Sequence, residues 1–445
     1  MTDRCDVVVV GGRCAGAYLA ARIAEAGVNT VVLDRSRFPS DRLSTHILQL
    51  NGAAALAHLG LTDELVATGA PPLTGMDVEI DGVDISSDFR CLPGDGPGAF
   101  CVRCRHLDVI LLRRAASAGA ATRTEAQVIG LERRNGRVVG VRWRARDGAE
   151  RRTIARLVVG ADGERSFVAR AVGATAYHVE PGERFVVWTY VAPDQARRPR
   201  IQFVRDGAEI FVSAPVDGGK QMVLTNPPLR WLPAARRDPA GFLAERCAGS
   251  AAMAWASGPV TRCGKAQVVG RCDNIFRTAT GAGWALVGDA GRSKDPCTGQ
   301  GMSDAFRQGE ALASAIVDGL RGGDLDARLA RWWRWRDRDE ARWAAFMAYQ
   351  GRGGAATELE RALLERLAEP RRRSDLSDVF AHRRTPLRAM PPGLVARAWR
   401  SAAQNHSVGL ATRQLLSLGV LEARWRWRLS SPWPAAPGPQ VVRAC

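Results

Sequence analysis

The sequence predicts an α/β fold that contains a parallel sheet, an inserted β-sheet domain and a C-terminal helical region. A run of β-branched residues near the N-terminus leads into a glycine-rich turn and then a helix. Two further strand–turn–helix units follow, near residues 160 and 288, and short strands with polar turns lie between them. At 445 residues the chain is longer than one hydrophobic core normally supports, so two or three domains are expected.

The first unit lies at the N-terminus. Asp6–Val10 is a β-branched run suited to a buried parallel strand, and it leads directly into the turn Gly11–Gly16. Ala17–Ala26 is rich in alanine and predicts a helix, and Val28–Leu33 predicts a second strand that is followed by Asp34. The order of strand, glycine turn, helix, strand and acid is typical of a dinucleotide-binding unit.

Each part of this unit has a physical role. Gly11 permits a tight turn after the strand, and Gly16 lets the helix pack closely on the sheet. Free N–H groups at the helix start would hold a pyrophosphate, and Asp34 would accept hydrogen bonds from a ribose. Arg13 replaces the middle glycine of the usual GxGxxG pattern, so either its side chain swings out and adds charge, or the cofactor shifts slightly. The predicted cofactor-binding residues are Gly11, Gly12, Arg13, Cys14, Ala15, Gly16, Asp34 and Arg35.

A second unit begins with a predicted strand over Trp284–Val287 and ends with a predicted helix over Met302–Gly319. Asp289 can bond a polyol such as the ribityl chain of a flavin, and the turn Gly299–Gly301 brings a helix start close to a flat ligand. Reduced flavin gathers negative charge, which a helix dipole would stabilise. The alternative is an ordinary corner in which Asp289 is only a cap. The predicted flavin-binding residues are Gly288, Asp289, Pro296, Gly299, Gln300, Gly301 and Met302.

Two weaker patterns lie between these units. Leu157–Gly163 predicts a strand that ends in Asp-Gly, followed by a helix over Ser166–Val172. Arg103 precedes Asp108 and a predicted helix over Val109–Ala118. Neither pattern identifies a function alone.

Together these residues resemble the FAD-dependent monooxygenase superfamily, of the group A or aromatic-hydroxylase type with the para-hydroxybenzoate-hydroxylase fold, over residues 5–345. GGRCAG matches its first FAD motif in a variant with arginine at the middle position. The Asp-Gly pair at Asp162 matches a motif that the family links to FAD and NAD(P)H. The segment from Gly288 to Met302 matches its second FAD motif, and Arg103 fits its FAD-contacting arginine.

The resemblance also implies a domain plan. Predicted strands separated by Asp-, Gly- and Pro-containing turns, over 184–191, 200–204, 209–216 and 221–225, support an inserted sheet. The plan consists of a Rossmann-type FAD-binding domain over 1–75, 94–175 and 268–345, a substrate domain over 76–93 and 176–267, and a C-terminal helical region with a Pro-rich tail over 346–445.

The family's chemistry implies FAD as cofactor, with NAD(P)H and O2 as co-substrates and an aromatic or otherwise apolar small molecule as substrate. In that family NAD(P)H reduces the flavin, O2 adds to it, and a C4a-hydroperoxide transfers oxygen. His46 is the candidate catalytic residue, as a proton relay or substrate contact, because its segment should follow the adenosine strand toward the flavin. The alternative is a structural histidine. Lys294 and Asp295 could face the flavin or form a surface ion pair.

Other functions share these motifs. FAD-dependent reductases and halogenases belong to the same superfamily. A halogenase typically has a Trp-x-Trp-x-Ile-Pro segment and an early catalytic lysine, but here no tryptophan precedes Trp143 and no lysine precedes Lys220. A protein that retains FAD without catalysis and docks through its C-terminal segment is an alternative of another class.

Composition bounds the partners and the location. The net charge is +17, but lysine occurs only at 220, 265 and 294 and the arginines are spread along the chain, so nucleic acid is not an expected partner. Ten cysteines are scattered, and the lone CxxC at Cys101–Cys104 lacks the second pair of a structural zinc site. We therefore expect no metal, reduced thiols, a cytoplasmic location and no transmembrane helix. Oligomeric state stays open.

Two segments interleave arginine with tryptophan, at 331–343 and at 424–428. In the first, Trp332, Trp335 and Trp343 fall near helical spacing, which favours packing onto the FAD-binding domain. Peripheral membrane contact, contact with a hydrophobic substrate and nucleic-acid binding are the alternatives.

Overall fold

The computed structural model describes residues 2–40, 47–257, 261–352 and 354–430. Its central sheet has the strand order β19-β20-β10-β1-β2-β7, and all of these strands except the edge strand β19 run parallel. A β8–β9 hairpin extends β10 in antiparallel fashion. The strands are β1 (Thr2–Val10), β2 (Thr30–Leu33), β7 (Ala121–Arg123), β8 (Gln127–Arg134), β9 (Arg137–Arg144), β10 (Glu150–Gly160), β19 (Thr280–Gly281) and β20 (Trp284–Leu286).

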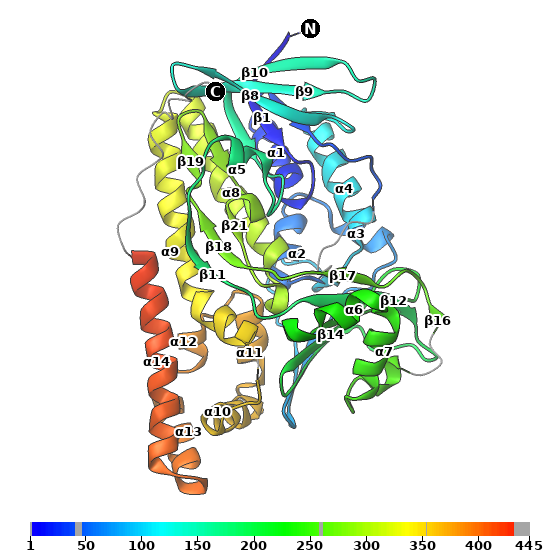
Figure 1. Cartoon of the computed structure of the whole chain (residues 1–445), viewed down its shortest axis with the longest axis vertical. Coiled ribbons are helices and arrows are strands. Elements are labelled where there is room, and N and C mark those ends of the chain that lie inside the picture. Colours follow the sequence, from blue (N-terminus) through cyan, green and yellow to red (C-terminus); the bar gives the residue numbers. More distant parts are fainter. Residues whose placement is uncertain (1, 41–46, 258–260, 353, 431–445) are drawn as a thin grey trace.

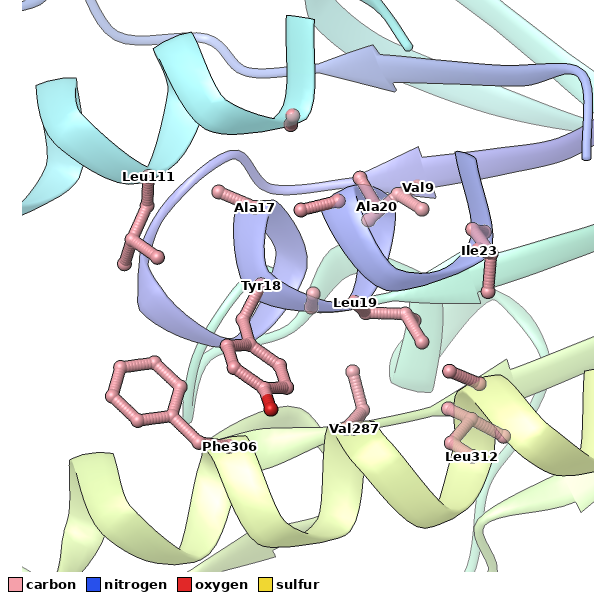
Figure 2. Packing of buried hydrophobic residues seen from close by; sticks show 14 of the residues in the cluster. Val9, Ala17, Tyr18, Leu19, Ala20, Ile23, Leu111, Val287, Phe306 and Leu312 are labelled. Carbon is pink, nitrogen blue, oxygen red and sulfur yellow. The ribbon is translucent and has the colours of Figure 1, made fainter. Parts of the chain in front are cut away.

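Both faces of this sheet are covered, which explains the β-branched composition of β1. Val7, Val8 and Val9 are 0% exposed, as expected for a central parallel strand. Three helices, α1 (Cys14–Glu25), α4 (Cys104–Ser117) and α8 (Gly301–Leu320), pack around Val7 and Val9, and Figure 2 shows side chains of this core. The other face packs against α5 (Phe167–Ala171) and the β8–β9 hairpin.

The second sheet is built from segments that are far apart in the sequence. Its order is β16-β12-β15-β14-β13-β4-β5, with β17 also paired to β12, and β13 and β4 are parallel. One face packs against α6 (Leu232–Arg237) and α7 (Pro239–Ala248). The strands are β4 (Gly75–Ile80), β5 (Val83–Asp88), β12 (Val186–Ala192), β13 (Arg200–Asp206), β14 (Glu209–Pro215), β15 (Gln221–Asn226), β16 (Thr261–Arg262) and β17 (Gln267–Val269).

Shorter elements connect the two sheets. β11 (Ala176–Glu180) pairs with β18 (Asn274–Arg277), which pairs with β21 (Arg292–Ser293), so residues 176–180 join a separate small sheet and not the second sheet. β3 (Ile47–Leu48) pairs with β6 (Phe100–Cys101). The remaining pieces are α2 (Leu50–Ala57), α3 (Thr62–Ala67) and 3₁₀ turns over 229–231, 254–256, 288–290 and 296–298.

The C-terminal part is helical. Helix α9 (Leu325–Arg352) runs without a break across residue 346, where the sequence analysis places a domain boundary. Figure 1 shows α14 along one side of the molecule, next to α9. No helix within the described ranges is both long and apolar enough to span a membrane. The other helices are α10 (Glu358–Ala368), α11 (Arg373–Phe380), α12 (Pro386–Ala389), α13 (Pro392–Asn405) and α14 (Val408–Ser430).

Candidate functional site

The carboxyl ends of four neighbouring parallel strands meet at one edge of the central sheet. Gly11, Asp34, Asp162 and Gly288 follow β1, β2, β10 and β20 within two residues. β1 connects through α1 to β2 on one side, and β10 lies on its other side. The edge is therefore a topological switch point, where open α/β sheets bind their ligands.

A cavity of about 1030 Å³ opens at this edge. Ligand pockets commonly measure ~300–1,000 Å³, so this cavity is large enough for an extended cofactor. Its wall combines the turns of the central sheet and the start of α8 with residues of β12, β15 and β17 from the second sheet. The predicted binding residues that line it are Gly11, Arg13, Cys14, Ala15, Asp34, Arg35, Asp162, Gly288, Asp289, Pro296, Gly301 and Met302.

The turn after β1 is too tight for side chains at two of its glycines. Gly11 has φ +104°, and a Cβ there would lie 2.4 Å from the carbonyl oxygen of Ala161. A Cβ at Gly16 would lie 1.8 Å from the carbonyl oxygen of Gly11. The N–H of Gly12 donates to Asp34 Oδ2 at 2.7 Å, so Gly12 and Gly16 shape the turn although neither lines the cavity.

The start of α1 lacks a side-chain cap. Arg13 is the N-cap residue, its side chain accepts no backbone hydrogen bond, and the first turn contains no acid. Cys14 and Ala15, which begin the helix, lie on the cavity wall. Uncapped N–H groups and the positive helix end together form an anion site, which fits a pyrophosphate.

The side chain of Arg13 turns toward α4. Its guanidinium donates to Asp108 Oδ2 at 2.9 Å and to Ser40 Oγ at 2.7 Å, and it lies 5.6 Å from the ring of Phe38. The side chain of Arg13 therefore turns away from the backbone cradle of the turn. Because Arg13 stays on the cavity wall, its positive charge remains beside the anion site.

Asp108 is a buried acid beside this cradle. Burial raises its pKa to about 7, although the charge of Arg13 opposes the shift and that of Asp34 adds to it. The carboxyl also accepts from Cys14 Sγ at 3.7 Å. Asp108 lines the cavity but was not among the predicted site residues, because a single acid in a helix carries no distinguishing pattern.

Asp34 is already hydrogen-bonded to the chain. Its Oδ2 accepts from the N–H of Gly12, and its Oδ1 accepts from the N–H of Ser36 at 2.7 Å. These bonds fix the orientation of the carboxylate on the cavity wall. Each carboxylate oxygen can accept a second hydrogen bond, so Asp34 could still bind ribose hydroxyls.

Asp162 caps the helix that follows it. Its Oδ2 accepts from the N–H of Phe167 at 2.6 Å, and its Oδ1 accepts from Ser166 Oγ at 2.5 Å. The side chain lies on the cavity wall while it holds the start of α5 in place.

Arg103 does not line the large cavity, although the resemblance implies a contact with FAD. Its Nε donates to Asp217 Oδ1 at 2.7 Å, and its guanidinium lies 5.6 Å from the ring centre of Tyr190. Burial alone would raise the pKa of Asp217, but Arg103 outweighs it and holds that pKa below its usual range. Arg103 thus ties the start of α4 to the second sheet.

The second ligand-facing helix start belongs to α8. Asp289 is exposed and lies on the cavity wall. Gly299 has φ +64°, and the N-cap residue Gln300 makes no side-chain cap. A Cβ at Gly301 would meet no atom within 4 Å, so the space beside this helix start is open to a ligand. A flat ring system fits that opening.

Three polar atoms near this start have no hydrogen-bond partner among the described residues. They are Thr298 Oγ1, Gln300 Oε1 and Ser303 Oγ, and all are buried. Buried polar groups in proteins are normally paired, with protein, water or ligand. None of these three residues lines the large cavity; Thr298 lines the smaller one, and Ser303 Oγ lies against Gly52 of α2. His46, the predicted catalytic residue, lies outside the described residues.

An ionic cluster lies beneath the start of α8. Lys294, on the cavity wall, bonds Asp304 and donates to both carboxylate oxygens of Glu340 at 3.0 Å. Burial disfavours ionised Asp304, but Lys294, His382 and Arg307 outweigh it and hold the pKa of Asp304 well below its usual range. Lys294 is therefore buried and paired with Asp304 and Glu340, not with Asp295 at the surface.

A smaller apolar cavity of about 20 Å³ adjoins the large one. The two share Val186, Leu224 and Pro296, and the smaller one is lined mainly by apolar side chains of β4 and β12–β15. Buried Gln49 Oε1 and Asn226 Oδ1 on its wall have no hydrogen-bond partner within the described ranges. At about 20 Å³ the smaller cavity has room for roughly one water-sized molecule, so a substrate would have to lie in the large cavity, against the apolar wall that the two share.

Several wall residues were missed. Glu164 and Arg165, directly after the Asp-Gly pair, and Arg170 of α5 line the large cavity. Their position just beyond a predicted strand end was a usable signal. Gln127 and Trp188 also line it, but they come from strands whose register the sequence does not reveal.

Comparisons with known proteins agree with this geometry. A family model described as an FAD binding domain matches residues 4–344. The 6-methylpretetramide 4-monooxygenase of Streptomyces rimosus is 29% identical over 332 residues, which cover 73% of this chain and 78% of that protein. The menaquinone reductase of Mycolicibacterium smegmatis is 25% identical over 354 residues, covering 72% and 78%.

A solved structure shares the fold. The flavin-dependent brominase Bmp2 superimposes with a TM-score of 0.73 at 18% identity, covering 93% of this chain and 98% of that chain. The matched family model spans most of the chain, including all four strand ends of the site. The chain therefore belongs to the FAD-binding-domain family within the FAD-dependent monooxygenase superfamily, and it is an FAD-dependent oxidoreductase.

Proposed function

We propose that this enzyme is an NAD(P)H-dependent monooxygenase that transfers one oxygen atom of O2 to an aromatic or otherwise apolar small molecule, by hydroxylation or epoxidation. The observation that carries the proposal is the junction of the two cavities, where the open start of α8 meets an apolar wall of the second sheet. The similarity to the Streptomyces 6-methylpretetramide 4-monooxygenase supports it.

The cofactor-binding residues follow from this placement. The start of α1 would bind the pyrophosphate and Asp34 the adenosine ribose, while Asp289 would bond the ribityl chain and the start of α8 would face the ring. When bound, FAD supplies hydride acceptance from NAD(P)H and activation of O2. The apolar walls at Val186 and Leu224 would exclude water and orient the substrate.

The test measures products under turnover. Polycyclic phenols and isoprenoid quinones are offered to the FAD-loaded enzyme with NADPH or NADH and isotopically labelled O2. We expect substrate-stimulated NAD(P)H oxidation, O2 consumption and a product that contains one labelled oxygen atom. A product that gains hydrogen without O2 contradicts the proposal.

Reduction is the second candidate, because the menaquinone reductase and digeranylgeranylglycerophospholipid reductases are also relatives. An anaerobic reaction that consumes NAD(P)H and saturates a double bond would favour it. If no tested substrate stimulates NAD(P)H oxidation while FAD stays bound, neither reaction is supported for these substrates.

A further inference from the structure

Helix α14 is firmly seated on one side only. Trp425 is buried and its ring centre lies 6.3 Å from that of Phe276. Leu421 joins the same apolar cluster, which includes Ala344 of α9, and Ala411 packs with α10 and α13. The inner face of α14 is therefore fixed along most of its length, so its outer face has a defined direction.

The outer face of α14 carries an apolar strip. The side chains of Leu416, Val420 and Trp427 are 62%, 65% and 71% exposed. Spacings of four and seven residues place the three on one helix face. Exposed apolar residues at such regular spacing on a well-packed helix indicate a contact surface.

The edges of this strip are basic. Arg413 and Arg424 lie on one edge and Arg426 on the other, by helical spacing, and all three are exposed. The acid in this helix, Glu422, is bonded to Arg426 at 2.7 Å. The whole chain carries a net charge of +17. An apolar strip between arginines is typical of a helix that lies in a lipid interface.

The charges distinguish between two occupants. A second copy of α14 would bring arginine edges of both copies together, and like charges across an interface are unfavourable. An anionic lipid surface is complementary to the arginines, and its acyl region would take up the apolar strip.

We propose that the outer face of α14 docks on an anionic membrane surface, with Leu416, Val420 and Trp427 inserted below the headgroups. The helix has 23 residues. At a rise of ~1.5 Å per residue it can lie along such a surface for roughly 35 Å. This docking goes beyond the proposed function and does not depend on which reaction the enzyme catalyses.

The test uses the full-length, FAD-loaded chain and sedimentation with lipid vesicles. We expect binding to vesicles that contain phosphatidylglycerol, weak binding to phosphatidylcholine alone, and weakening by added salt. Val420→Glu should reduce vesicle binding by ~10-fold or more, because it places a charge in the apolar strip. Flavin absorbance and NAD(P)H oxidation in the absence of vesicles should not change.

Val66→Glu is the matched control, because Val66 is an exposed valine on α3 and the charge change is identical. Equal losses in the two variants would overturn the proposal, since net charge alone would then explain binding. Absence of binding to either vesicle would also overturn it. So would a dimer that forms with rising concentration and is abolished by Val420→Glu.

Discussion

The starts of α1 and α8 face the same cavity but differ in the charge beneath them. α1 has no acid in its first turn, and Arg13 at its N-cap adds a positive charge beside the uncapped N–H groups. α8 carries Asp304 in its first turn, and Lys294, Arg307 and His382 surround that acid. At the start of α1 the charge of Arg13, which is paired with the buried acid Asp108, adds to the uncapped N–H groups, whereas the start of α8 lies above a cluster of paired charges.

This difference suits the two ends of the proposed cofactor. A pyrophosphate has a permanent negative charge, so a start that stays positive binds it in every redox state. A flavin ring is neutral when oxidised and gathers negative charge when reduced. A helix dipole with compensated charges beneath it can accept both forms, since neither form leaves a large unbalanced charge.

The largest effect is expected from Gly16→Ala. The new Cβ would lie 1.8 Å from the carbonyl oxygen of Gly11, so β1 and α1 must separate. We expect loss of FAD binding and a decrease of more than ~4 kcal/mol in the free energy of unfolding, as for severe backbone clashes. Gly12→Ala is the milder comparison, because its Cβ would meet side-chain carbons and no backbone, namely those of Leu112 at 3.0 Å, Asp34 at 3.3 Å and Val32 at 3.4 Å. Equal effects of the two variants on chemical denaturation would contradict the account.

Lys294→Met tests the ionic cluster under α8. Removing one partner from a buried ionic group costs ~3–5 kcal/mol of stability. The double variant Lys294→Met/Glu340→Gln removes charges of opposite sign, so its loss should be smaller than the sum of the single losses. Lys265→Met, at an exposed lysine, is the control and should change the unfolding free energy little. Additive losses in the double variant would show that the cluster does not act as a unit.

Asp108→Asn tests the acid beside the start of α1. Its folded pKa is about 7, against an ordinary value of 3.8, so between these values the folded chain keeps a proton that the unfolded chain releases. This contribution makes stability fall as pH rises through that window, by at most ~1.4 kcal/mol per pH unit. The asparagine variant lacks it, so variant stability relative to the parent should rise between about pH 4 and about pH 7. Denaturation curves with a constant difference would contradict the prediction.

The elements near these two helix starts could be predicted because their signals are local. Residues 6–34 carry the strand, the turn and the helix in one continuous pattern, and the observed β1, α1 and β2 lie within a few residues of the predicted bounds. The same holds for β20 and α8. The helical spacing of Trp332, Trp335 and Trp343 predicted packing onto the FAD-binding domain. Trp332 is buried in that core, but Trp343 is buried against the C-terminal helices and Trp335 is exposed.

The rest depends on contacts between distant segments. Arg103 meets Asp217 across 114 residues, and Lys294 meets Glu340 across 46 residues. No periodicity in a single sequence reveals such pairs. α4 begins at Cys104, earlier than the predicted Val109, and its N-cap residue Arg103 makes no side-chain cap that would mark this start in the sequence. His46 stays a prediction.

The smallest effect is expected from Gly301→Ala, which separates ligand contact from protein packing. The added Cβ meets no protein atom within 4 Å, so the apoprotein should keep its stability or gain ~0.5–1 kcal/mol from the helix preference of alanine. The methyl group would occupy space that the proposed flavin needs, so FAD affinity should fall by ~10-fold, equivalent to ~1.4 kcal/mol. Gly419→Ala in α14 is the matched control. Its Cβ also meets nothing within 4 Å, and no residue of α14 lines the cavity. Titration of both apoproteins with FAD decides the matter: if Gly301→Ala binds FAD as tightly as Gly419→Ala, the ring does not approach the start of α8, and the difference between the two helix starts needs another explanation.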